Sequence, residues 1–230
     1  MTTTLITGSN KGLGHEAARR LIAAGQDVWM TARDPEQGKQ AADELGARFV
    51  QLDVTEDDSV RAAADTVAGQ TGLDVLVNNA GITGVLAEVP DTTPENVRET
   101  FETNVFGVVR VVRAFTPLLD RSDAPVVVNV SSGLGSLDWT SDPERLESTF
   151  VNLSYSSSKS ALNMLTSQWS KVYPGWRVNA VDPGYTATDL NGHSGTQSVQ
   201  EGTDAIVEAA SVAADGPTGT FFGREGARPW

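Results

Sequence analysis

The sequence has no cysteine and few basic residues, and these two absences exclude several functional classes. Without cysteine the chain has no disulfide, no thiolate nucleophile and no cysteine-ligated metal. Because 17 Lys and Arg residues stand against 30 Asp and Glu residues, the formal net charge is −13. Such a charge argues against nucleic acid or an anionic membrane surface as the main partner. We therefore expect any chemistry to come from other groups, and we predict no metal site.

Long apolar runs are absent as well. The N-terminal residues 1–4 pass into the first apolar run without a basic segment, and no later segment reaches about 20 apolar residues. We therefore expect a soluble, cytoplasmic protein. No internal repeat, linker or low-complexity tract divides the 230 residues, which suffice for one α/β domain spanning residues 1–230.

What the sequence does contain is a regular alternation of short apolar runs with helical patterns. The expected strands lie at 4–7, 27–31, 48–52, 73–77, 125–130, 176–181 and 219–222, and the expected helices at 15–22, 36–45, 57–67, 94–119, 155–172 and 199–212. The strand at 125–130 is almost wholly apolar, as a central parallel strand should be. The alternation predicts an α/β protein with a parallel sheet.

The first expected strand ends in a glycine-rich turn that leads into a helix. Glycines let the backbone turn sharply and let a pyrophosphate approach the amides of a helix N-terminus, where the helix dipole favours negative charge. Many glycine-rich turns only close a loop, but a position after the first strand favours cofactor binding. The candidate cofactor-binding residues of this turn are Gly8, Asn10, Lys11, Gly12, Leu13 and Gly14.

The end of the second expected strand indicates which nicotinamide cofactor is used. An acidic residue there accepts hydrogen bonds from a ribose 2′-hydroxyl, whereas an arginine accommodates a 2′-phosphate. Arg33 occupies this place and favours NADP(H), and Lys11 could add a second positive charge. If Arg33 is only a solvated surface residue, Asp34 could take the acidic role, and NAD(H) remains the alternative.

Later strand ends supply further candidate cofactor-binding residues. Asp53, with Val54, follows the third strand and could bond an adenine amine or cap the next helix. The small residues after the fourth strand would let a nucleotide lie across the strand ends. These candidates are Asn79, Ala80 and Gly81, and those of the segment leaving the sixth strand are Pro183, Gly184, Thr186 and Thr188.

Tyr155 and Lys159 form a candidate reacting pair. Residues four apart stack on one helix face, and a nearby ammonium draws a phenol pKa of about 10 toward the working range. Leu162 and Trp169 lie close to the same helical angle, so this face should pack on the sheet and direct the pair toward the strand ends. An isolated pair of this kind arises by chance on many helices, so its meaning depends on the rest of the chain.

Taken together, these motifs resemble the short-chain dehydrogenase/reductase family, in order and over nearly the whole chain. The motifs are Thr7 to Gly14, Asn78 to Gly81, Asn104, Ser131-Ser132, Tyr155 to Lys159 and Pro183-Gly184. The resemblance implies a Rossmann-type, doubly wound parallel sheet of about seven strands that binds NADP(H) or NAD(H). It implies that Tyr155 and Lys159 also touch the cofactor, with Tyr155 as general acid/base. Lys159 would lower the pKa of Tyr155, Ser132 would polarise the substrate carbonyl, and Asn104 would hold a water in a proton relay.

Within this family the sequence is similar to NADPH-dependent carbonyl reductases, which implies a ketone or aldehyde as the small-molecule substrate. An NAD-linked alcohol dehydrogenase and a catalytically silent dinucleotide-binding regulator are the alternatives. Twenty-three positions separate Ser132 from Tyr155, fewer than in monomeric relatives with a full insertion, so monomer and homo-oligomer (dimer or tetramer) both stay open. Candidate pocket residues, each of which could instead be packing, are Leu134, Trp139, Phe150, Tyr185 and His193; for His193 a loop role is favoured.

Overall fold

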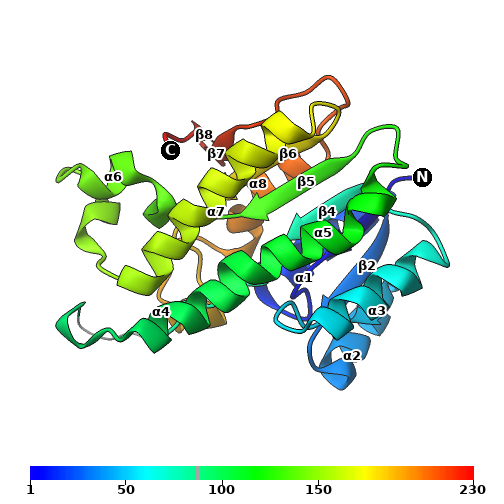
Figure 1. The fold of residues 1–230 in the computed structure, drawn as a ribbon, viewed down its shortest axis with the longest axis horizontal. Helices are drawn as coiled ribbons and strands as arrows, with labels where there is room; N and C mark the ends of the chain where they lie inside the picture. Colours follow the sequence, from blue (N-terminus) through cyan, green and yellow to red (C-terminus); the bar gives the residue numbers. More distant parts are fainter. Residues whose placement is uncertain (86–88) are drawn as a thin grey trace.

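A computed structural model describes residues 1–85 and 89–230, and its centre is one parallel sheet (Figure 1). The strands are β1 (Thr3–Ile6), β2 (Asp27–Ala32), β3 (Arg48–Gln51), β4 (Val75–Asn78), β5 (Val126–Val130), β6 (Arg177–Asp182), β7 (Phe221–Gly223) and β8 (Gly226–Ala227). Their order is β3-β2-β1-β4-β5-β6-β7-β8, parallel except for the pairing of β7 with β8. The predicted doubly wound sheet is confirmed, with β8 as a short addition to the seven expected strands.

Helices cover both faces of the sheet because successive strand residues point to opposite sides. In β1, Leu5 packs into a core with α3 (Asp57–Ala68), α5 (Val108–Leu119) and α7 (Leu153–Val172). The next residue, Ile6, packs into the other core with α1 (Gly12–Ala23), α2 (Pro35–Leu45) and α8 (Val199–Ala210). The same alternation along β4 and β5 places apolar residues on both faces, as fully covered parallel strands require.

The single long helix predicted at 94–119 is interrupted in the structure. It consists of α4 (Pro94–Phe101), a π-helical segment η2 (Glu102–Gly107) and α5. Widened turns of this kind are often found at functional sites. Asn104 lies within the π-helical segment and is only 1% exposed, so it faces the interior rather than solvent.

The irregular segment expected before the tyrosine helix contains three short helical pieces. They are η3 (Gly133–Gly135), α6 (Leu137–Ser141) and η4 (Leu146–Thr149). Gly135 lets this segment approach α7 closely, because a Cβ there would lie 2.8 Å from the backbone carbonyl carbon of Lys159. The loop after β5 is therefore packed directly against the helix that carries the candidate reacting pair.

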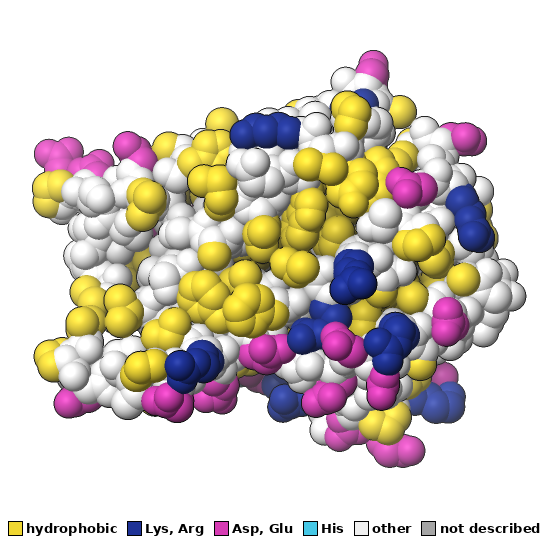
Figure 2. Space-filling model, in the orientation of Figure 1, with side chains coloured by type: hydrophobic (Ala, Val, Ile, Leu, Met, Phe, Trp, Pro, Cys, Tyr) yellow, Lys and Arg dark blue, Asp and Glu magenta, His cyan; other side chains and the backbone are white. Residues whose placement is uncertain are grey.

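Hydrophobic side chains gather on the face formed by α5 and α7 (Figure 2). Phe106, Val109 and Met164 are 50%, 38% and 60% exposed. The sequence left open whether the segment before α7 covers this face, and the structure shows that it leaves these three side chains exposed.

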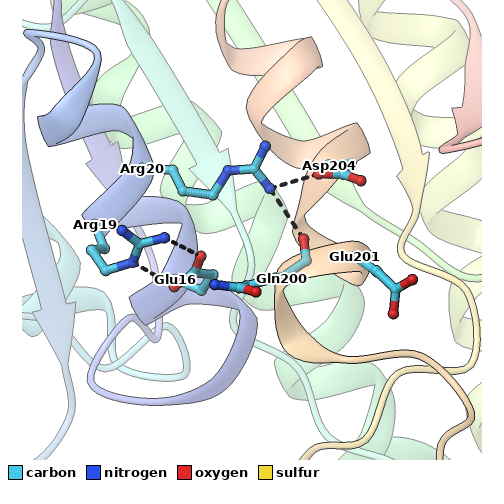
Figure 3. Close-up of a pocket in the computed structure, with 6 residues that line it drawn as sticks. All are labelled: Glu16, Arg19, Arg20, Gln200, Glu201 and Asp204. Atoms are coloured by element: carbon cyan, nitrogen blue, oxygen red, sulfur yellow. Dashed lines mark hydrogen bonds and ion pairs between the residues drawn. The ribbon is translucent and has the colours of Figure 1, made fainter.

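A charged surface cleft of about 280 Å³ lies between α1 and α8 (Figure 3). Arg20 on α1 donates to Asp204 on α8 over 2.7 Å, and Arg19 pairs with Glu16 on its own helix. Glu201 is paired with Arg224 over 2.8 Å. Since each charged side chain of this cleft already has an ionic partner, we interpret the cleft as a joint between two helices rather than as a reaction site.

Candidate active site

The predicted site residues meet at the carboxyl edge of the sheet, where parallel strands place ligands in open α/β folds. The glycine turn follows β1, Asn79 to Gly81 follow β4, and Ser132 follows β5. The N-terminus of α7 begins beside them. Asn152 caps this helix, and its Oδ1 accepts a hydrogen bond from the backbone N–H of Tyr155 over 2.9 Å.

Tyr155 and Lys159 lie on one face of α7, as predicted. Lys159 is 5% exposed, and its Nζ lies 5.6 Å from the centre of the Tyr155 ring. The same Nζ donates to the backbone carbonyl oxygen of Val130 in β5 over 2.8 Å. This bond ties the helix to the end of the central strand and fixes where the ammonium lies.

The two groups have shifted pKa values for which burial is the main cause. Burial raises the pKa of Tyr155 to about 12, against a lowering effect of its hydrogen bond with Ser132 and a further increase from the charge of Asp182. Burial lowers the pKa of Lys159 to about 8. The effect of Lys159 on the pKa of Tyr155, implied by the family resemblance, stays a prediction, and in this structure the ammonium hydrogen-bonds to Val130. The phenol is therefore protonated at neutral pH, which is the form a general acid needs.

Ser132 and Asn104 reach this pair from two other elements. The Ser132 hydroxyl hydrogen-bonds with Tyr155 and also accepts from the backbone N–H of Leu134 over 3.2 Å. Asn104 donates to the Ser158 hydroxyl on α7 over 3.0 Å. The structure thus brings together all four residues predicted to be catalytic.

Gly81 lies close to both Asn104 and Lys159. A Cβ at this position would lie 3.3 Å from Asn104 Oδ1 and 3.6 Å from Lys159 Nζ. The absence of a side chain therefore lets the backbone after β4 pass close to both polar groups, and the role of Gly81 in cofactor binding stays a prediction.

A buried polar network, which the sequence analysis missed, anchors α7 to the sheet. Ser131 donates to Asn163 over 2.6 Å, and Asn129 donates to Thr166 over 2.8 Å. All four side chains are at most 3% exposed. The signal for them was Asn129, a polar residue inside an otherwise apolar strand, because a buried amide needs a hydrogen-bond partner.

The glycine turn packs tightly against the residues that follow β4. Asn79 Nδ2 donates to the carbonyl oxygens of Thr7 and Gly8, each over 2.9 Å. Gly8 and Gly12 have positive φ values of 60° and 59°, which favour glycine. Leu13 is half-buried against the core that contains α1. The turn and the Asn79 segment therefore form one preorganised unit.

Replacing Gly14 with alanine should destabilise this unit. A Cβ there would lie 2.5 Å from Asn79 Nδ2 and 2.8 Å from the Gly8 carbonyl oxygen, both too close. We expect the free energy of unfolding to fall by roughly 1–3 kcal/mol in urea titrations. Gly175→Ala is the matched control, since a Cβ at Gly175 meets nothing within 4 Å. Equal stability of the two variants would contradict the tight packing described above.

The two residues predicted to determine cofactor preference, Arg33 and Asp34, differ in the contacts that their side chains make. Arg33 is exposed, and its guanidinium pairs with none of the side chains that the structure describes. Asp34 caps α2, where one carboxylate oxygen accepts from the N–H groups of Glu36 and Gln37 over 3.0 and 3.1 Å. Its second oxygen accepts from the Gln37 side chain over 2.8 Å. Both oxygens of Asp34 are thus already in use.

Lys11 has an exposed side chain at the rim of the glycine turn, and the neighbouring Asn10 is half-buried. Lys11 Nζ forms an ion pair of 2.7 Å with Asp189, which also lies 2.9 Å from His193 Nε2. Asn10 donates to Gln37 over 3.4 Å. The Lys11 ammonium lies at the predicted turn, but its partner in this structure is the segment after β6.

The other predicted cofactor residues mostly make local contacts. Asp53 Oδ1 accepts from both the N–H and the hydroxyl of Thr55. Val54 is 8% exposed, so its side chain is part of the core. Beyond β6, Gly184 has a φ of 72°, and Thr186 donates to the Pro183 carbonyl oxygen over 3.0 Å. Thr188 is the N-cap residue of η5 (Asp189–Asn191).

A cavity of about 100 Å³ opens beside the Ser132 hydroxyl. It is lined by Ser132, Gly133, Leu134, Leu146, Glu147, Phe150, Asp182, Gly184 and Tyr185. Three of the five predicted pocket residues are therefore in its wall. Trp139 instead lies beneath the Arg145 guanidinium at 3.6 Å, and His193 pairs with Asp189 on a loop. Glu147 was missed, because nothing in the irregular sequence around it indicates where its side chain lies.

Residues 1–85 and 89–230 contain neither a candidate metal site nor a candidate membrane span. No cluster of side chains in these ranges could hold a metal ion. No helix in the same part of the chain is long and apolar enough to cross a membrane.

Comparison with known proteins gives one consistent result. The family model described as short chain dehydrogenase matches residues 2–198. The (+)-neomenthol dehydrogenase of Arabidopsis thaliana is 33% identical over 96% of this chain and 95% of the relative, and salutaridine reductase of Papaver bracteatum is 30% identical over 96% and 94%. The NADPH-bound carbonyl reductase from chicken fatty liver has a TM-score of 0.87 and 29% identity, covering 100% of this chain and 99% of that one.

Proposed function

The chain belongs to the short-chain dehydrogenase family and is an oxidoreductase acting on CH–OH and C=O groups; from this premise we propose that it reduces ketones or aldehydes with NADPH. The observation that carries the proposal is the position of the Tyr155 phenol, hydrogen-bonded with Ser132 and one helical turn from Lys159. A protonated donor at the carbonyl oxygen is what reduction to an alcohol requires.

The glycine turn, Gly81 and the N-terminus of α1 are the parts of the chain that would bind the dinucleotide. The positive φ angles of Gly8 and Gly12 shape the sharp turn after β1, and the backbone of Gly81, which has no side chain, lies beside Asn104 and Lys159 at the carboxyl edge of the sheet. When bound, the reduced nicotinamide supplies the hydride. The helix α1, which begins at Gly12, directs its N-terminal N–H groups and its dipole toward this edge.

The predicted catalytic residues have different roles at the substrate oxygen. The Ser132 and Tyr155 hydroxyls are adjacent and can both donate to it, which polarises the carbonyl. The Tyr155 proton moves to the oxygen as negative charge develops there, and the nearby Lys159 ammonium stabilises the phenolate left behind. Asn104 is the group proposed to hold the water through which Lys159 is connected to solvent.

The contacts of the Arg33 and Asp34 side chains support a preference for NADPH. The Arg33 guanidinium is exposed at the end of β2 and is available for a 2′-phosphate. For the NAD-linked alternative, Asp34 would have to accept the ribose hydroxyls with a carboxylate that already takes three hydrogen bonds at the start of α2. We therefore favour NADPH over NADH.

Arg33→Ala should weaken NADPH binding selectively. Loss of a charge-assisted contact to phosphate costs about 1.5–3 kcal/mol, or roughly 10- to 100-fold in Kd. Fluorescence titration with NADPH and NADH measures both constants, and we expect the ratio to shift toward NADH. Arg121→Ala is the control, since Arg121 is exposed at the opposite edge, just before β5. If the ratio of the Kd values for NADPH and NADH is unchanged in Arg33→Ala, Arg33 does not bind the 2′-phosphate.

The test of the function is a panel of ketones and aldehydes, read with both cofactors through loss of the reduced nicotinamide absorbance. We expect oxidation of NADPH by at least one carbonyl class and weaker oxidation of NADH. A preference for NADH would support the NAD-linked alternative. No turnover across a broad panel would favour the silent dinucleotide-binding regulator.

A further inference from the structure

The cavity beside Ser132 has an unusual charge for a pocket that accepts a ketone. Two carboxylates, Glu147 and Asp182, and two aromatic rings, Phe150 and Tyr185, lie in its wall. None of its lining residues, among those the structure describes, is a lysine, arginine or histidine. Any charge that the substrate meets at this wall is therefore negative.

Both carboxylate oxygens of Asp182 already contact other groups of the protein. Its Oδ1 accepts from the N–H groups of Gly133 and Gly184 over 2.9 and 3.0 Å, and its Oδ2 faces the Arg228 guanidinium at 3.4 Å. Both partners of this ion pair are buried, with side chains 11% and 6% exposed. Glu147 is thus the carboxylate that remains for a ligand.

Glu147 is held in place but not saturated. Arg145 donates to its two oxygens over 3.1 and 3.2 Å. A carboxylate offers about four acceptor positions, so two remain open. Burial raises the pKa of Glu147, but the hydrogen bond from Arg145, a backbone hydrogen bond and the charges of Arg145 and Arg228 together outweigh burial, and the net pKa lies below its ordinary value. The side chain is therefore ionised at neutral pH.

The carboxylate lies close to where the carbonyl is placed. Glu147 Oε1 would be 3.2 Å from a Cβ on Gly133, the residue directly after Ser132. The Arg145 guanidinium lies over the Trp139 ring at 3.6 Å, so a second contact besides Glu147 holds it in position. A donor on the substrate, a few bonds from the carbonyl, could reach Glu147 while the carbonyl reaches Ser132.

The aromatic side of the cavity suits the same kind of group. The Phe150 and Tyr185 rings have centroids 5.6 Å apart and are tilted by 52°. Aromatic faces attract cations, and the net charge of −13 favours the approach of a cationic molecule from solution.

We propose that the preferred substrates are ketones or aldehydes with a protonated amine near the carbonyl, recognised by Glu147 and by the Phe150–Tyr185 ring pair. This inference rests on the proposed reductase function and names its substrate class. Because Arg145 neutralises part of the Glu147 charge, we expect a preference of about tenfold, at the lower end of a charged hydrogen bond.

The test compares three matched ketones: one with a protonated dimethylamino group, its neutral isopropyl isostere, and one with a carboxylate at the same place. We expect kcat/KM for the amino ketone to exceed that for the isostere about tenfold, and the carboxylate ketone to be the poorest. In Glu147→Gln the ratio should fall to near one. In Glu147→Asp, which keeps the charge and guards against a folding defect, part of the preference should return.

Glu144→Gln is the matched control. It removes the same charge three residues away, from an exposed side chain outside the cavity wall. The tenfold ratio should persist in this variant. A wild-type ratio near one, or a ratio that survives in Glu147→Gln, overturns the proposal.

Calorimetric binding of the same ketones separates this inference from the reductase function. If no ketone is turned over, but wild type still binds the amino ketone about tenfold more tightly than the isostere and Glu147→Gln does not, the function fails and the pocket assignment stands. If ketones are turned over without any such preference, the function stands and the assignment fails.

Discussion

Replacing Tyr155 with phenylalanine should lower kcat for ketone reduction about a thousandfold, within the range of roughly 10²–10⁴ that general acid catalysis contributes. The change removes one oxygen atom and keeps the ring in place. That oxygen hydrogen-bonds with Ser132 and carries the proton that the product alcohol needs, since the pKa of Tyr155 is raised to about 12. The phenol of Tyr185, which also lines the cavity, is hydrogen-bonded with Ser194 over 2.6 Å.

Single-turnover kinetics with saturating NADPH measure this effect directly. Tyr173→Phe is the control, because Tyr173 lies at the other end of α7 and stacks on Trp176 with centroids 4.0 Å apart. Thermal unfolding should show that both variants are folded. Turnover retained in Tyr155→Phe would show that another group protonates the product.

Replacing Lys159 with methionine should abolish activity and stabilise the protein. Burial lowers the pKa of Lys159 from 10.5 to about 8, so the folded state holds an ammonium in an unfavourable place at pH 7. At about 1.4 kcal/mol per pKa unit, this costs about 3 kcal/mol. Loss of the hydrogen bond to Val130 destabilises the variant by about 1 kcal/mol and so offsets part of this gain. We therefore expect a net stabilisation of about 2 kcal/mol at pH 7.

The pH dependence gives this prediction a clear sign. Between pH 8 and 10.5 the unfolded chain keeps a proton on Lys159 that the folded chain has lost, so the wild type gains stability as pH rises. The cost is fully present below pH 8 and disappears toward pH 10.5. The advantage of Lys159→Met should therefore shrink over this interval in urea unfolding curves.

Lys171→Met is the matched control, since Lys171 is exposed on the same helix. It should change the free energy of unfolding little at any pH. If Lys159→Met is less stable than wild type at pH 7, or if its advantage does not depend on pH, burial of the ammonium is not the cost inferred here.

The sequence predicted the sheet and the central part of the site because both depend on local patterns. Buried parallel strands read as apolar runs, and the turn around Gly8 and the motif from Tyr155 to Lys159 each lie within a few residues. The topology alone then brings the strand ends together, among them the end of β5 that carries Ser132, whereas the place of Asn104 was implied only by the family resemblance.

The features that escaped prediction depend on contacts between distant segments. The Ser131–Asn163 bond depends on how α7 lies against β5, which no local pattern specifies. The position of Glu147 depends on Arg145, which in turn rests on Trp139. The π-helical turn was missed because the apolar residues on either side continue a regular helical spacing.

The π-helical turn determines what happens when a residue is deleted from this part of the chain. A π turn holds one residue more than an α turn, so the number of residues between Glu102 and Gly107 matters as much as their identity. Deleting one of them would restore regular α-helical turns, so α4 and α5 would keep their relative orientation. The side chains within the segment would shift instead, and Asn104 would lose its hydrogen bond to Ser158. We therefore expect a single-residue deletion here to leave the packing of α5 on the sheet intact and to remove the Asn104 contact.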